Sequence, residues 1–143
     1  MGMFGAIDSA ASGLTAERLR LDVISNNIAN VNTTRTAEGG PYRRQMVVFE
    51  PQSGTSFAAA LSSQMGQGSG VRVSGITKDQ SPLRMVYEPN HPDANANGYV
   101  AMPNVNVVTE MVDMITATRS YEANVTVINS AKSMAAKALE IGK

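Results

Sequence analysis

Two long helical patterns, one at each end of the chain, most constrain its fold. Within residues 4–31, apolar residues recur at steps of seven, at Ile7, Leu14, Leu21 and Ile28. After Pro103, mostly apolar positions alternate at steps of four and three, interrupted by Thr118 and Lys132; this set includes Met111, Met114, Tyr121, Val125, Ile128 and Leu139. Such spacing lines one face of a helix. It predicts two amphipathic helices, the second about 35 residues and about 50 Å long.

The stretch between these patterns predicts a small, irregular β module. Five of the six prolines lie within residues 34–102, and glycines cluster there, which excludes long helices. Strand-like runs occur at 42–49, 71–77 and 83–87, and in the second Val71 and Val73 alternate with Arg72 and Ser74. Residues 57–63 suit either a short helix or a loop. Pro103 and Asn104 then suit the stop and cap before the second helix.

The expected fold is mainly α with a small β insertion. The terminal helices, residues 1–33 and 104–143, pair as an antiparallel coiled coil, and residues 34–103 form the β-rich module with its long loops. Further apolar residues, among them Val108, Val112 and Ile115, lie off the second seam. Spare apolar stripes on a two-helix hairpin favour packing against other subunits. The alternative is a monomeric helical bundle with an inserted hairpin.

Composition argues against several classes of function. Lys and Arg number 12, as do Asp and Glu, so the net charge is zero and no nucleic-acid partner is expected. With no cysteine and one histidine, thiolate and His-rich metal sites are excluded within one chain. No apolar run reaches about 18 residues and the N-terminus lacks a basic region, so neither membrane insertion nor a cleaved signal peptide is expected. No catalytic constellation stands out, and we expect neither enzyme activity nor a cofactor.

One stretch partly matches a calcium-binding loop. Residues 93–104 begin with Asp93, Asn95 and Asn97 and include the turn glycine Gly98. The loop needs a bidentate glutamate at its twelfth position, which here is Asn104. A calcium-binding regulatory module is therefore an alternative function of a different class, and Asn-Gly turn chemistry is the competing explanation.

Residues 12–32 read SGLTAERLRLDVISNNIANVN. This stretch resembles the N-terminal helix shared by the bacterial flagellar rod, hook and hook-associated proteins. The motif residues are Ser25, Asn26, Asn27, Asn30 and Asn32. Residues 32–45, 98–108, 110–114 and 119–124 are similar to the short proximal-rod subunits of that family, and another short rod subunit is the runner-up within it. The asparagines suit either bonds to neighbouring subunits or a bend near the helix end. Arg43 and Arg44 suit either a grip on an acidic partner or a solvated strand end.

The resemblance implies a structural role in the basal body of the bacterial flagellum. Members are exported by the flagellar type III apparatus without a cleaved signal peptide. They assemble into the periplasm-spanning rod, a tube that transmits torque and passes later subunits. The implied partners are other rod subunits, copies of the chain itself, a rod-cap protein and the export apparatus. The implied subunit interface consists of the helix seams, at Ile7, Leu14, Leu21, Ile28, Met111, Met114, Tyr121, Val125 and Ile128.

Overall fold

A computed structural model describes residues 3–52 and 70–141, so residues 57–63 lie outside the described residues. Helix α1 (Met3–Ala29) is followed by strands β1 (Gln45–Pro51), β2 (Val71–Lys78), β3 (Arg84–Tyr87) and β4 (Tyr99–Met102) and by helix α3 (Val107–Ile141). The predicted fold class, mainly helical with a small β insertion, is confirmed. The 35 residues of α3 equal the length that the sequence predicts.

The cap of α3 differs from the predicted one. Asn106 holds that place, since its Oδ1 accepts the backbone N–H groups of Val108 and Thr109 at 3.0 and 3.4 Å. An asparagine side chain supplies the acceptor that these first-turn donors lack within the helix. Asn104 instead accepts the N–H of Arg44 at 2.9 Å. Its side chain therefore attaches the start of the helical segment to the chain leading into β1.

The strands form two separate antiparallel hairpins. In the first, Gln45 of β1 pairs with Lys78 of β2, and the register shifts at a bulge between Val48 and Phe49. In the second, β3 pairs with β4. The sequence did not predict β4, because this strand directly follows turn-forming asparagines and Gly98. Val71 and Val73 are half-buried whereas Arg72 and Ser74 are exposed, as the alternation in β2 predicts.

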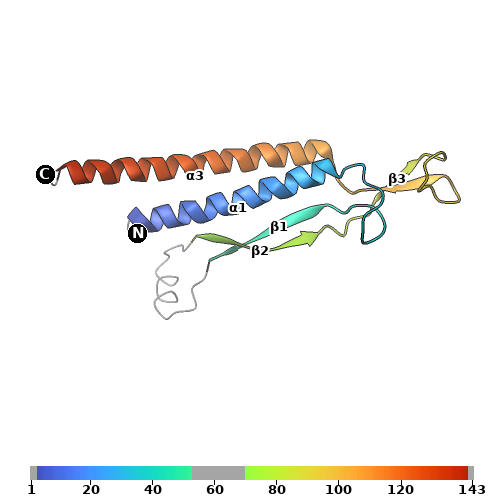
Figure 1. Ribbon diagram of the computed structural model, residues 1–143, viewed down its shortest axis with the longest axis horizontal. Coiled ribbons are helices and arrows are strands. Elements are labelled where there is room, and N and C mark those ends of the chain that lie inside the picture. The colour runs from blue at the N-terminus through green and yellow to red at the C-terminus, as the bar shows by residue number, and fades with distance from the viewer. Residues whose placement is uncertain (1–2, 53–69, 142–143) are drawn as a thin grey trace.

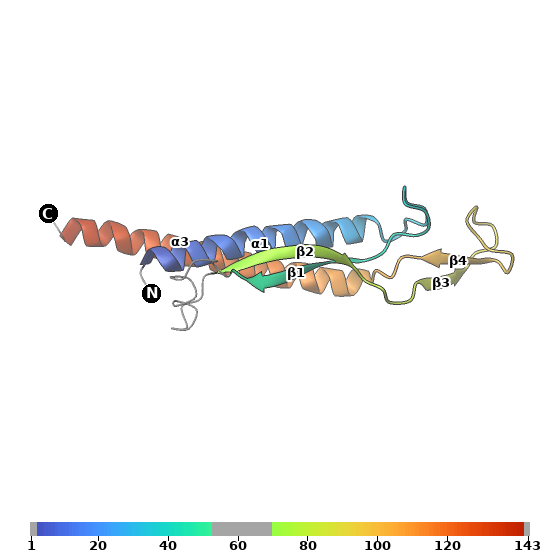
Figure 2. The same ribbon diagram turned by 90° about the horizontal axis from the view of Figure 1, so that it is seen from below.

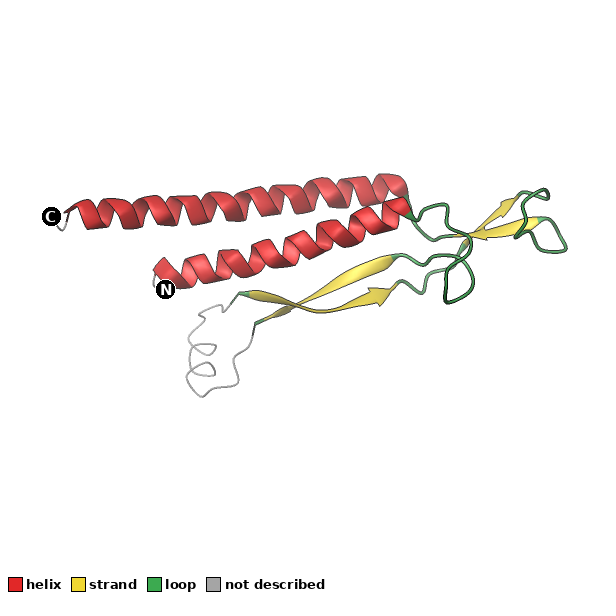
Figure 3. Cartoon of the chain, viewed as in Figure 1, coloured by secondary structure: helices red, strands yellow, loops and turns green. Residues whose placement is uncertain are grey.

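The elements lie side by side along one long axis (Figure 1). The two helices run antiparallel, and α1 lies between α3 and the β1–β2 hairpin, so it is covered on two sides (Figures 1 and 2). The β3–β4 hairpin projects beyond the end of the helices where α1 finishes and α3 begins (Figure 3). Both termini of the described chain lie at the opposite end.

The helices approach each other through small side chains. Ala10, Ala16 and Ala131 are buried, and Ala117 is fully so. A Cβ added at Gly13 would lie 2.8 Å from Nδ2 of Asn124, which places the two backbones close together at this level. Small residues bring helix axes together, and tight packing makes an added methyl group costly.

Within the chain, the predicted seam on α3 coincides only in part with the face that contacts α1. Met114, Tyr121 and Ile128 are half-buried as the seven-residue repeat predicts. Met111 is 54% exposed, and Thr118, Lys132 and Leu139 of the same set are exposed as well, whereas Val125 of that set is half-buried. The packed positions lie one residue earlier, at Glu110, Ala117, Asn124 and Ala131. A search for large apolar residues passes over them because they are small or polar.

Gly13 gives the first testable prediction. Alanine at this helical position gains about 1 kcal/mol of helix propensity, but its methyl group must displace the Asn124 amide. We expect the effect of Gly13→Ala on the free energy of unfolding to be more stabilising by about 1 kcal/mol when Asn124 is also alanine. Urea unfolding of the wild type, the two single variants and the double variant measures this coupling. Strictly additive effects would contradict the close contact.

Candidate assembly site and the polar junction that supports it

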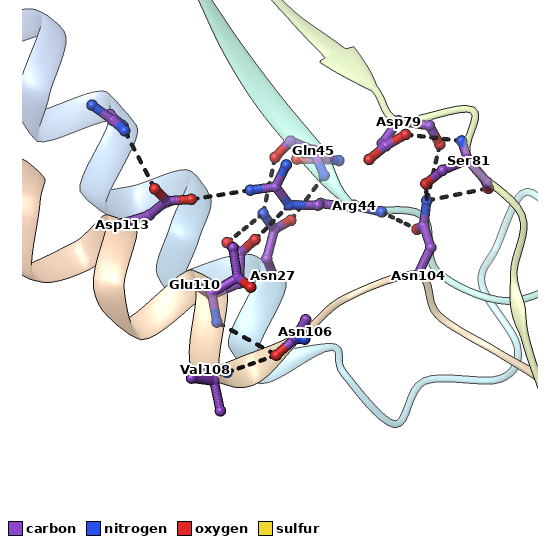
Figure 4. A network of polar contacts seen from close by, with 12 residues as sticks. Asn27, Arg44, Gln45, Asp79, Ser81, Asn104, Asn106, Val108, Glu110 and Asp113 are labelled. Carbon is purple, nitrogen blue, oxygen red and sulfur yellow. Dashed lines mark hydrogen bonds and ion pairs between the residues drawn. The ribbon is translucent and has the colours of Figure 1, made fainter.

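Asn27 makes four hydrogen bonds within the chain, although it lies in a helix and is only 1% exposed. Its Oδ1 accepts from the hydroxyl of Tyr42 and from the N–H of Gln45, both at 2.9 Å. Its Nδ2 donates to the carbonyl of Gln45 at 2.9 Å and to Oε2 of Glu110 at 3.0 Å. One side chain thus joins α1, the start of β1 and α3 (Figure 4). Neither role that the sequence suggested for Asn27 describes it.

Glu110 is the charged centre of this junction and is fully buried. Besides accepting from Asn27, it forms an ion pair with Arg44 through Nε of the guanidinium. Nη2 of Arg44 also donates to Asp113 at 3.2 Å, and Asp113 lies 3.7 Å from Arg20 of α1. A buried carboxylate is tolerated only when it is paired and hydrogen-bonded. Arg44 therefore grips acidic groups of its own chain.

The junction extends to the chain that leaves β2. Nδ2 of Asn104 donates to Oγ of Ser81 at 2.9 Å and to the carbonyl of Asp79 at 3.2 Å. Hydrogen bonds from Ser81 lower the pKa of Asp79 below its usual value. The segments before β1, after β2 and before α3 are consequently held together at the end of the helix pair (Figure 4).

Tyr42 gives a pH-dependent prediction. Burial, together with the nearby Glu110 carboxylate, raises the pKa of Tyr42 above 10.0. A proton held more tightly in the folded state adds stability that is complete below pH 10 and is lost as the pH rises through the folded pKa. We expect the advantage of the wild type over Tyr42→Phe to be constant from pH 7 to 9 and to shrink above pH 10. Urea unfolding across this range tests it, and a constant difference would contradict it.

A second attachment holds the far end of the β1–β2 hairpin to α1. Oγ of Ser12 donates to the carbonyl of Ser9 at 2.7 Å and accepts the N–H of Val71 at 3.0 Å. Gly70 precedes Val71 with a φ of +93°, and a Cβ there would fall on the Ser12 hydroxyl. The position therefore requires glycine for both backbone conformation and space.

We expect Gly70→Ala to lower the free energy of unfolding by about 2–3 kcal/mol, the sum of left-handed strain and a steric clash. Two glycines provide matched controls. Gly39 has a φ of +88° and open space around it, so alanine there measures the strain alone. Gly75 has open space and no positive φ, so alanine there is expected to be nearly neutral. Equal effects at Gly70 and Gly39 in thermal unfolding would exclude the clash.

The outward face of α3 carries an apolar stripe. Val108, Met111, Val112 and Ile115 follow the i, i+3, i+4, i+7 spacing of one helical face. Val108 is 70% exposed, and the other three are each more than half exposed. At 100° per residue, the stripe lies opposite the side that carries Glu110 and Ala117 and packs on α1. Three of its members were expected off the seam, and the structure confirms that they remain uncovered within the chain.

The other predicted site residues occupy varied positions. Ile7, Leu14, Leu21 and Ile28 are half-buried, while the fully buried side of α1 carries Val23, Ile24 and Asn27. Val125 is half-buried, and Ser25, Asn26 and Asn32 are exposed. Asn30 supports the helix end, because its Nδ2 donates to the carbonyl of Asn26 at 2.9 Å and its Oδ1 accepts from the Thr33 hydroxyl at 3.1 Å.

The stretch that partly matches a calcium loop is occupied by local contacts. Asp93 pairs with Arg35 at 2.8 Å and accepts from the Thr34 hydroxyl at 2.9 Å. Oδ1 of Asn95 accepts the N–H groups of Asn97 and Tyr99 in a tight turn. Within residues 3–52 and 70–141, no group of three or more acidic or histidine side chains is placed to hold a metal ion. No helix in the same ranges is long and apolar enough to cross a membrane.

Known protein families match the two ends of the chain, and individual proteins match it over its whole length. The family described as "Flagella basal body rod protein" matches residues 7–35, and "Flagellar basal body rod FlgEFG protein C-terminal" matches residues 96–141. The flagellar basal-body rod protein FlgC of Borreliella burgdorferi is 56% identical over 99% of this chain and 98% of its own length. Those of Bacillus subtilis and Salmonella typhimurium are 52% and 41% identical over the full length of both chains.

Proposed function

The chain belongs to the FlgC family of flagellar basal-body rod proteins, and from this membership we propose how its surfaces serve the rod. It is a structural rod subunit of the basal body and assembles there with other rod subunits. We infer that it polymerises through its terminal helices into the tubular shaft that transmits torque and passes exported subunits, and that it has no catalytic role. The observation that carries this proposal is the exposed stripe opposite the packed face of α3.

The geometry supports separate roles for the polar junction and for the outward stripe of α3. The junction around Asn27 and Glu110 fixes the helix pair and the β1–β2 hairpin as one unit. The stripe at 108–115 and the exposed parts of the half-buried seams can then pack against neighbouring subunits. If the stripe meets a different surface of the neighbouring subunit, and the rotation between subunits does not close, the contact generates an open helical assembly. The helix pair then forms the inner layer of the tube and the β hairpins its outer side.

The same proposal includes the partners of the chain and its route of export. Copies of the chain, other rod subunits and a rod-cap protein are its partners during growth. The flagellar type III apparatus exports it without a cleaved signal peptide, and residues 93–104 serve as a turn and the following strand β4 rather than as a calcium site. The chain takes a position in the proximal part of the rod, and its short middle module supports this part of the proposal.

Deletion of the gene in its own bacterium, with complementation, tests the function. We expect lost swimming and basal bodies that have rings but neither a complete rod nor a hook. Complementation with the wild-type gene should restore both. Complete hook–basal bodies and normal swimming in the deletion strain would remove the rod assignment.

A further inference from the structure

The contacts between the helices fix their register. Asn27 meets Glu110, and Gly13 lies against Asn124, so the chain advances by 14 residues in each helix between these two levels. Ten residues further, Met3 at the start of α1 lies opposite residue 134 of α3. Residues 135–141, the last two turns of α3, therefore extend about 10 Å beyond the start of α1, and Figure 1 shows this extension.

The extension carries apolar side chains that α1 does not cover. Leu139 is 75% exposed, and Met134 at its base is more than half exposed. An isolated helix end of two turns has little stability of its own and gains it by packing. Leu139 is therefore left without cover by α1 within the described residues.

The two uncovered apolar patches of α3 lie at opposite ends of the helix. The stripe at 108–115 and the extension at 135–141 are separated by more than half of the 35 residues of α3. The two patches therefore meet when a second helix is shifted along the axis of α3, not when it is placed in register.

We propose that the stripe of Val108, Met111, Val112 and Ile115 receives the C-terminal extension of α3 from the next subunit along the rod. The occupant is a helix end of the kind that this chain carries, with the exposed side chains of Leu139 and Lys137. The negative end of its macrodipole then lies beside the positive start of the receiving helix, which favours the contact. The contact is head-to-tail, so it repeats along the rod without closing.

This inference rests on the proposed function, and it is tested in the assembled rod. A photo-crosslinking amino acid is placed at Val112, or at Leu139, in motile cells, and the crosslinked peptides of isolated basal bodies are identified by mass spectrometry. We expect the probe at 112 to join the C-terminal end of a rod subunit's last helix. The probe at 139 should join the first turns of that helix. Thr126, exposed and between the two patches, serves as the control position and should give neither product.

Three results would overturn the proposal while leaving the rod function intact. In swimming cells, the probe at 112 could join another subunit's stripe, or it could join a β hairpin. The third such result is that neither probe gives a product. A probe at Met111, also on the stripe, replaces Val112 if the bulky group at 112 blocks assembly. Absence of the chain from purified basal bodies would instead remove the proposed function itself.

Discussion

Replacing Asn27 with alanine is expected to lower the free energy of unfolding of the isolated chain by about 3–4 kcal/mol, or to lower Tm by roughly 10 °C. The loss occurs although alanine favours the helix, because the substitution leaves the Tyr42 hydroxyl, the backbone of Gln45 and the buried Glu110 carboxylate short of partners. Buried polar groups without partners cost the full desolvation penalty.

Two further variants make this result specific. Asn27→Asp keeps the shape of the side chain but turns an acceptor toward the carbonyl of Gln45 and the Glu110 carboxylate, so we expect an effect at least as large. Asn129→Ala makes the same amide-to-methyl change at an exposed position of α3 and should change stability by no more than about 0.5 kcal/mol. A loss below 1 kcal/mol for Asn27→Ala in thermal and urea unfolding would show that the junction does not hold the fold.

The second large effect is expected on assembly rather than on folding. The combined substitutions Val112→Lys and Ile115→Lys place two charges on the outward stripe of α3. Both side chains are more than half exposed, so the stability of the isolated chain should change by less than about 1 kcal/mol. Buried against a neighbouring subunit, unpaired lysines cost several kcal/mol each, and we expect rod completion and swimming to be abolished.

Thr116→Lys is the matched control, because Thr116 is exposed next to Ile115 but lies off the stripe. Complementation of a deletion strain compares the variants by swimming and by the number of completed basal bodies. Normal swimming with both lysines on the stripe would exclude this surface from assembly. Equal loss with Thr116→Lys would show that the whole helix surface, rather than the stripe, resists added charge.

Periodicity predicted the helices well because it is a local property of the sequence. The extent of α1, the length of α3 and the alternation of Val71 and Val73 in β2 all follow from spacing alone. The packed face of α3 did not follow, since α1 meets it at Glu110, Ala117, Asn124 and Ala131. These side chains let two backbones come close or bond across the contact, and neither property appears in a search for large apolar residues.

The polar junction depends on contacts between distant parts of the chain. Asn27 and Glu110 lie 83 residues apart, and Arg44 lies 66 residues from Glu110. Two signals pointed toward it without naming its partners. An asparagine within a helical pattern is unfavourable unless its side chain is used, and Glu110 stands among apolar residues near the start of α3. Neither signal indicates that Tyr42, which precedes β1, also bonds to Asn27.

The central claim is that α3 joins neighbouring rod subunits through its outward stripe while its opposite face holds the chain together. Cryo-electron microscopy of isolated basal bodies, at a resolution that shows side chains, tests it most directly. We predict density for this helix pair in the inner layer of the rod, with Val108, Val112 and Ile115 packed against a neighbouring subunit and Asn27 bonded to Glu110 within its own chain. A stripe that faces water, or an Asn27 side chain that bonds to another subunit, would contradict the account.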